Sequence, residues 1–169
     1  AEHLDYYRTF EKSCEAYLSF FNRTDPAGRV FVCAECPNSM KLLERISHPH
    51  PVTYGLSRTA QYFPERILRN NDETQFDCIG RGKRLGRFRI SLSGRHNLVN
   101  ALGAIALGNE MGLPLSAMQE ALAFFQGVER RLEVTPFPAL SIVEDYAHHP
   151  TEIEATLGAI REGAEKRRI

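Results

Sequence analysis

The chain has 169 residues, of which 43% are hydrophobic and 25% are charged, and its formal net charge is zero. This composition excludes a disordered segment, and a protein dedicated to nucleic acid is usually basic. No run approaches the roughly 20 apolar residues of a membrane helix, and the first five residues lack the features of a signal peptide. We therefore expect a cytoplasmic protein that binds neither nucleic acid nor membrane.

The first third of the chain predicts alternating helices and strands. Apolar residues at spacings of three and four predict a helix over residues 8–22, which a Pro-Ala-Gly turn at 26–28 ends. Residues 29–34 predict a buried strand, and a short helix over 37–46 and a second strand over 52–55 follow. This order is typical of a mostly parallel sheet with helices on its faces.

Two cysteines, Cys33 and Cys36, form a CxxC motif at the end of the first predicted strand. Such a motif is half of a zinc site or a redox pair, but no second CxxC or HxxxH follows it. At the end of a buried strand, a free cysteine behaves as a small hydrophobic residue. We therefore favour free, reduced cysteines over zinc binding or redox chemistry.

Residues 61–91 show short alternating segments, with turns predicted at 70–72 and 80–82. Residues 87–92 alternate between polar and apolar side chains, which predicts a strand with one solvated face. We expect an antiparallel meander beside the parallel sheet. A solvated hairpin face also explains the local basic run, and nucleic-acid binding is the alternative; the run consists of Arg81, Lys83, Arg84, Arg87 and Arg89.

Helical periodicity returns at Gly94 and ends at residues 112–114, and a further helix is predicted over 115–125. Two short strands then follow over 132–134 and 141–145.

Pro150 suits the first turn of a last helix, because a missing N–H costs nothing there. Residues 167–169 resemble the start of another strand. We therefore expect this chain to be a piece of a longer α/β protein.

Asn97 and Asn100 are the first candidate ligand-binding residues. They are three residues apart and so share a helix face near its start. A carboxamide offers a donor and an acceptor, which matches the N6 and N7 edge of adenine, and a helix N-terminus favours phosphate. The alternative is that Ser93 or Asn97 only caps the helix.

Arg130 and Arg131 form the second candidate, between Glu129 and Glu133. Adjacent arginines point to different faces, so one can reach a phosphate while the other pairs with a glutamate. Surface salt bridges alone are the alternative.

The third candidate is the segment 144–152, which places carboxylates, a phenol and two imidazoles between a strand and a helix. In open α/β sheets, ligands bind beyond the carboxyl ends of strands, where Asp145 could hold a ribose hydroxyl. Helix capping and surface histidines are the alternative. The chain contains no phosphate-binding loop of the G-x-x-x-x-G-K-[ST] type.

These segments together resemble the Mur ligases in order and spacing: GRHNLVNALGAIA, GVERRLE and EDYAHHPTEI, preceded by HLDYY. The resemblance implies an α/β fold of two parts. Residues 1–131 would be the later part of the central ATPase domain, a mixed sheet with helices and a small antiparallel meander, without its phosphate-binding loop. Residues 132–169 would begin a Rossmann-like C-terminal domain.

The resemblance also implies a nucleotide site that takes ATP. Asn97 and Asn100 would contact adenine, with His96 beside them. Arg131 would face the nucleotide phosphates across the domain boundary, and Asp145 would hold the ribose.

Three further roles are implied near the reacting groups. Tyr146 and His148 would lie near the incoming amino acid and, together with Arg131, form the catalytic set. His3 would be a ligand of Mg²⁺.

The implied reaction transfers the ATP γ-phosphate to the carboxylate of UDP-N-acetylmuramate, and L-alanine then attacks the acyl phosphate. HLDYY and DYAHHPTE are most similar to the members that add L-alanine, whereas the ligase that recycles murein tripeptide shares RRLE and AHHPT. Because the phosphate loop and the UDP-sugar domain are missing, we expect no ADP release from this chain alone. A non-catalytic nucleotide-binding or interaction module is the remaining alternative.

Overall fold

The computed structural model describes residues 3–70, 73–92 and 94–164 of the chain. Three features expected from the sequence lie outside these residues: most of the turn at 70–72, the capping role of Ser93 and the strand entry at 167–169.

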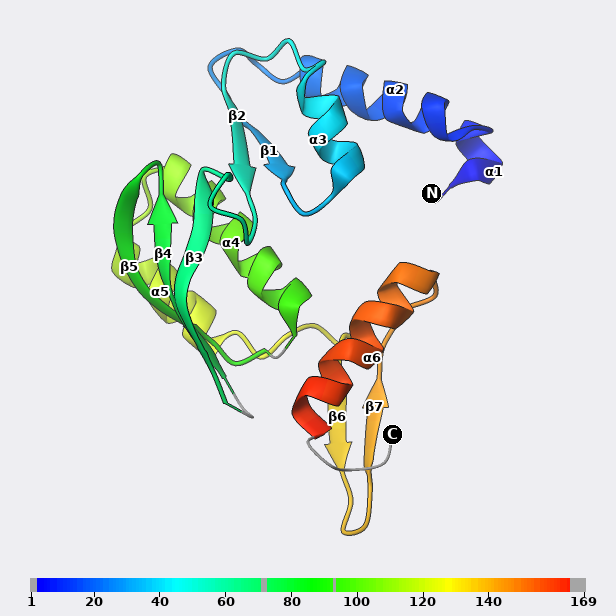
Figure 1. The fold of residues 1–169 in the computed structure, drawn as a ribbon, viewed down its shortest axis with the longest axis vertical. Helices are drawn as coiled ribbons and strands as arrows, with labels where there is room; N and C mark the ends of the chain where they lie inside the picture. The colour runs from blue at the N-terminus through cyan, green and yellow to red at the C-terminus, as the bar shows by residue number, and fades with distance from the viewer. Residues whose placement is uncertain (1–2, 71–72, 93, 165–169) are drawn as a thin grey trace.

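Two helices open the chain at one end of the molecule, α1 (Leu4–Tyr7) and α2 (Phe10–Asn22) (Figure 1). Thr9 caps α2, since its hydroxyl oxygen accepts a hydrogen bond from the Lys12 N–H at 3.3 Å. The helix predicted over residues 8–22 is confirmed, but no residue of α2 is fully buried. None of the described helices is long and apolar enough to cross a membrane.

A five-stranded sheet forms the centre of the fold, in the order β1 (Val30–Cys33), β2 (Pro51–Tyr54), β3 (Tyr62–Arg69), β4 (Thr74–Gly80) and β5 (Lys83–Ile90). The helix α3 (Pro37–Leu43) connects β1 to β2. The β1–β2 and β2–β3 pairs are parallel, and the β3–β4 and β4–β5 pairs are antiparallel. The mixed α/β sheet predicted from the sequence is therefore confirmed.

The antiparallel meander continues the parallel pair within one sheet, whereas the sequence predicted it beside that sheet. A single register pair, Tyr54 with Tyr62, joins β2 to β3. This junction is reinforced by the Gly55 N–H, which donates to the Tyr62 carbonyl at 3.0 Å.

The core lies between this sheet and two helices, α4 (Arg95–Glu110) and α5 (Leu115–Phe124). The helix α4, whose periodicity the sequence predicted, packs against β1 to β4, while α5 packs against β5. The fully buried side chains come from both layers: Val52, Tyr62, Phe76, Cys78 and Phe88 from the sheet, and Leu98, Leu102, Ile105 and Ala106 from α4. This packing holds α4 firmly on the sheet, with its first turn directed toward the C-terminal elements (Figure 1).

The C-terminal end of α4 is anchored by Glu110, whose side chain is only 8% exposed. Its carboxylate accepts hydrogen bonds from Arg81 Nε and Nη2 at 2.5 and 2.9 Å, the Tyr62 hydroxyl at 2.7 Å and Arg29 Nε at 3.2 Å. The bonds from Arg81, which outweigh the opposing effect of burial, lower the pKa of Glu110 to about 2. One carboxylate thus ties α4 to three parts of the sheet.

The arginines of the basic run are engaged in ion pairs. Arg84 and Arg87 both bind the carboxylate of the buried Asp77, at 3.0 and 3.1 Å. Arg89 pairs with Glu73 at 3.5 Å. Hydrogen bonds from Arg84 and then Arg87 hold the pKa of Asp77 below its ordinary value. Together with the Arg81–Glu110 pair, these contacts account for the four arginines of the run.

A separate two-stranded sheet of β6 (Glu133–Pro136) and β7 (Ser141–Glu144) follows, and α6 (Pro150–Ala164) comes after it. Both strands and the helix that the sequence predicted here are confirmed. The residues joining α5 to β6 include the predicted domain boundary after Arg131, and that boundary stays a prediction.

Candidate functional site

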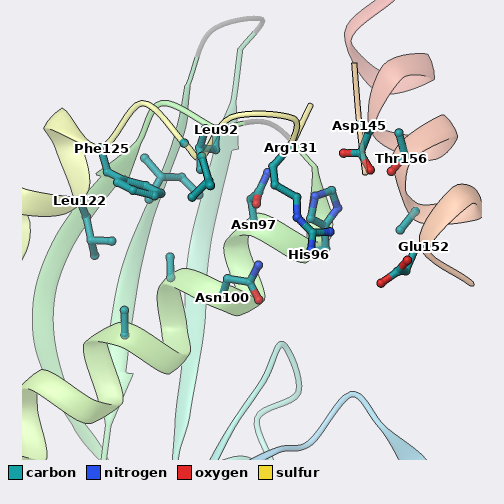
Figure 2. A pocket seen from close by; sticks show the side chains of 16 residues that line it. Leu92, His96, Asn97, Asn100, Leu122, Phe125, Arg131, Asp145, Glu152 and Thr156 are labelled. Carbon is teal, nitrogen blue, oxygen red and sulfur yellow. The ribbon is translucent and has the colours of Figure 1, made fainter. Parts of the chain in front are cut away.

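A pocket of about 570 Å³ lies between the first turns of α4, the segment after α5 and the first turns of α6 (Figure 2). Its polar wall contains all five residues that the sequence assigned to nucleotide contact: His96, Asn97, Asn100, Arg131 and Asp145. Its apolar wall comes mainly from the end of β5 and from α5, with Ile90, Leu92, Leu122, Phe125 and Val128. An apolar pocket with a few converging polar groups is the usual form of a small-molecule site.

The first turns of α4 supply the two carboxamides of the pocket. Because Asn97 and Asn100 are three residues apart, both side chains project from the same face of α4 toward the pocket (Figure 2). The N-cap of α4 is Gly94, and no side-chain hydrogen bond caps it.

Gly94 allows the start of α4 to approach α6 closely. Its φ of 94° is a conformation that favours glycine. A Cβ at this position would lie 2.9 Å from the Ala159 Cβ on α6 and 2.9 Å from His96 Cε1. A side chain at position 94 would therefore push apart two walls of the pocket.

The carboxylate of Asp145 is held in one orientation by two backbone N–H groups. Asp145 Oδ2 accepts from Leu132 at 2.9 Å, and Oδ1 accepts from Ala147 at 2.7 Å. Each carboxylate oxygen keeps a further lone pair, so the group remains able to accept hydrogen bonds from a bound diol. These bonds also tie the start of β6 to the end of β7.

Arg131 lies in a backbone segment of unusual conformation. Both of its neighbours adopt the left-handed region, Arg130 with a φ of 58° and Leu132 with a φ of 52°. Non-glycine residues in this region are uncommon and cluster at functional sites. The guanidinium carbon of Arg131 lies 5.9 Å from the centre of the Tyr146 ring, a cation–π contact.

Tyr146 and His148 lie beside the pocket and do not line it. Their rings are 5.3 Å apart and meet edge to face. His148 Nδ1 is 3.0 Å from the Tyr146 carbonyl oxygen and 3.7 Å from Glu152 Oε2. Their predicted contact with the amino acid stays a prediction.

His3 lies apart from the pocket, at the exposed start of α1, where its φ is 57°. Within the described residues, no group of three His, Cys, Asp or Glu side chains is placed to hold a metal ion. The four cysteines are free. The role of His3 in Mg²⁺ binding stays a prediction.

Three residues of α6 line the pocket without having been assigned a role from the sequence: Glu152, Ala155 and Thr156. Of these, only Glu152 belongs to the candidate segment 144–152. Glu152 Oε2 accepts hydrogen bonds from the N–H groups of His148 and His149, at 3.2 and 3.3 Å. These two bonds, with a small contribution from Arg131, lower its pKa against the effect of burial. Glu152 follows Pro150 at the third position of the helix, a capping signal, and Thr156 lies one turn further along the same face.

Three comparisons relate the chain to known proteins. Residues 1–108 match the model of the Mur ligase middle domain. A UDP-N-acetylmuramate–L-alanine ligase from Anaeromyxobacter dehalogenans is 41% identical over 169 residues, which cover 99% of this chain and 36% of that relative. The chain thus spans little more than a third of the relative's length.

Solved structures agree with this match. A UDP-N-acetylmuramate-alanine ligase from Thermotoga maritima superposes with a TM-score of 0.80 at 29% identity, covering 98% of this chain and 37% of that one. MurF from Acinetobacter baumannii shares the fold, with a TM-score of 0.80 at 20% identity, over 94% of this chain and 34% of that one. Since the family model covers more than half of its residues, the chain belongs to the Mur ligase family.

Proposed function

We propose that this chain forms the adenine-nucleotide site of a cytoplasmic ligase that joins L-alanine to UDP-N-acetylmuramate in peptidoglycan synthesis. The observation that carries the proposal is the pocket, where α4, Arg131 and Asp145 bring together donors and acceptors from distant parts of the chain. The choice of L-alanine is supported by the name of the relative at 41% identity.

Each part of ATP has a partner of suitable chemistry in the pocket. Asn97 and Asn100 present donors and acceptors to the adenine edge, and the neighbouring apolar wall accommodates the ring. The fixed carboxylate of Asp145 accepts hydrogen bonds from the ribose hydroxyls. The guanidinium of Arg131 faces the phosphates, for which a planar fork of N–H donors is suited.

The reaction proceeds in two steps. A carboxylate oxygen of UDP-N-acetylmuramate attacks the γ-phosphorus of ATP, and ADP leaves. The neutral amine of L-alanine then attacks the acyl carbon, and the tetrahedral intermediate expels phosphate. Arg131 offsets negative charge on the phosphates, while Tyr146 and His148 position the amino acid, so catalysis rests on orientation and electrostatics.

Mg²⁺ would neutralise phosphate charge when bound. His3 is the proposed ligand within this chain. Since no group of three His, Cys, Asp or Glu side chains among the described residues could hold a metal ion, His3 does not form a magnesium site by itself.

Titration of the chain with a fluorescent ADP analogue tests the proposal. We expect Asn97→Ala with Asn100→Ala to weaken binding at least about tenfold, because the carboxamide hydrogen bonds to adenine are lost. Asn38→Ala is the matched control, since Asn38 also lies in the first turn of a helix, α3, but outside the pocket. Equal binding by the double variant and the control would refute the nucleotide assignment.

Two alternatives predict different results. The first alternative is a murein tripeptide ligase of cell-wall recycling. In that case, a protein that contains this chain would release ADP when tripeptide is added and not when L-alanine is added. A nucleic-acid binder would show salt-sensitive RNA binding without affinity for ADP.

A further inference from the structure

Glu35 connects three elements near the start of α4. It lies in the turn between Cys33 and Cys36, directly after β1. Its Oε1 accepts a hydrogen bond from the Leu56 N–H at 2.8 Å, just beyond β2. Its Oε2 forms an ion pair with Arg95 Nη2, on the first residue of α4.

The backbone beside Glu35 leaves room for its carboxylate. β1 and β2 are parallel, so their carboxyl ends meet at one edge of the sheet. A Cβ at Gly55 would lie 3.0 Å from Glu35 Oε1 and 3.1 Å from the Ala34 Cβ. The glycine at position 55 therefore leaves the space that the carboxylate occupies.

The ion pair fixes the start of α4 relative to the sheet. Glu35 holds the side chain of the first residue of α4, and its other carboxylate oxygen is bound just beyond β2. Arg95, which Glu35 holds, is followed directly by His96 and Asn97 of the pocket. Glu35 itself does not line the pocket, so its influence on a ligand passes through Arg95.

The charge of Glu35 strengthens the contact. Burial raises the pKa of its carboxyl, but the hydrogen bonds from Leu56 and Arg95, with the charge of Arg95, outweigh that effect and leave the pKa below its ordinary value. The Glu35 side chain is 22% exposed and that of Arg95 is 65% exposed. An exposed pair of this kind adds little to global stability, so its main effect is local.

We propose that Glu35 is a positioning residue of the nucleotide site. By holding Arg95 against the ends of β1 and β2, it keeps the first turn of α4 in the orientation that presents His96 and Asn97 to the pocket before a ligand binds. The effect on affinity rests on the proposed function, whereas the effect on the helix turn does not.

A double-mutant cycle tests the proposal with Glu35→Gln, Arg95→Gln and the double variant, again by titration with fluorescent ADP. We expect each single change to weaken binding about five- to tenfold, and the double change to be no worse than either, because both remove one contact. Glu65→Gln is the matched control, since Glu65 pairs with Arg58 at 2.8 Å on the meander, away from the pocket. A change of less than about twofold for Glu35→Gln, or additive effects in the cycle, would overturn the proposal.

Amide hydrogen exchange of the ligand-free chain provides the second readout. We expect exchange at residues 98–101 to be several-fold faster in Glu35→Gln than in Glu65→Gln, with the urea midpoint of unfolding almost unchanged. Unchanged exchange in Glu35→Gln would overturn the positioning role. If the wild-type chain fails to bind ADP, the proposed function fails, and exchange alone then decides whether Glu35 orders the helix turn.

Discussion

The two regions that meet at the pocket differ in how they are stabilised. The five-stranded sheet buries large side chains such as Tyr62, Phe76 and Phe88 completely under α4 and α5. No residue of β6 or β7 is buried, and Val134 and Ile142 are more than half exposed. The first region therefore has a core of its own, whereas the second depends on local hydrogen bonds and on contact between α6 and α4.

Truncation of a core side chain should give the largest loss in the free energy of unfolding. Phe76→Ala should lower the free energy of unfolding by about 3–5 kcal/mol, because it leaves a cavity beside Phe88, whose ring stacks on Phe76 at 6.0 Å. Val134→Ala on β6 should cost less than about 0.5 kcal/mol. Urea denaturation followed by circular dichroism measures both, and similar losses would contradict the comparison.

Acid should weaken the first region through Glu110. Its carboxyl has a pKa of about 2 in the folded chain and an ordinary value near 4.5 when unfolded. A depressed pKa contributes stability that is present above pH 4.5 and is lost as the pH falls through 2, in total about 3 kcal/mol.

Unfolding free energies at several pH values between 7 and 2 would measure this loss. In Glu110→Gln the stability at neutral pH should already be lower, and its further decline below pH 4.5 should be smaller by about the same amount. Parallel pH profiles for the wild type and the variant would exclude this role for Glu110.

The contact between the two regions is probed by Gly94→Ala. The added Cβ would meet Ala159 of α6 and also require a strained φ, so we expect a loss of about 1–2 kcal/mol. Gly112→Ala has a similar φ of 75° but meets nothing within 4 Å. The excess loss in Gly94→Ala over Gly112→Ala, measured by thermal unfolding, reports the contacts of the added Cβ with Ala159 and His96. Equal losses would show that backbone strain alone matters.

Asp145→Ala tests the ligand contact that the second region contributes to the pocket. ADP affinity should fall about tenfold, or about 1.4 kcal/mol, because the ribose acceptor and the tie between Leu132 and Ala147 are both removed. Glu144→Ala is the control, since Glu144 forms an exposed pair with Arg130 at 3.3 Å and does not line the pocket. Similar affinities for the two variants would argue against a ribose contact at Asp145.

The sequence predicted most elements and five polar residues of the pocket wall. Apolar residues at spacings of three and four indicate which face of a helix is buried. The helix α4 was therefore predictable, as was the shared face of Asn97 and Asn100. The position of Asp145 between a strand and a helix already indicated a ribose ligand, and the motif resemblance singled out Arg131 from the adjacent arginines. The structure brings both residues to the same pocket as α4.

Long-range pairings were not predictable in the same way. The union of meander and parallel strands depends on one register pair, Tyr54 with Tyr62, and periodicity does not report which strand edges meet. The contact of Glu35 with Arg95 likewise joins residues that are 60 positions apart. Glu152 carried a local capping signal, but its place on the pocket wall required the position of α6.

The hydrogen bond between Tyr62 and Glu110 has a spectroscopic consequence. The chain contains six tyrosines and no tryptophan, so its near-ultraviolet absorbance is dominated by phenols. Burial, together with the bond to the Glu110 carboxylate, raises the pKa of Tyr62, and burial also raises the pKa of Tyr54. In an alkaline titration, these two phenolates should appear later than those of exposed tyrosines, so the absorbance of phenolate would report directly when the junction of β2, β3 and α4 opens.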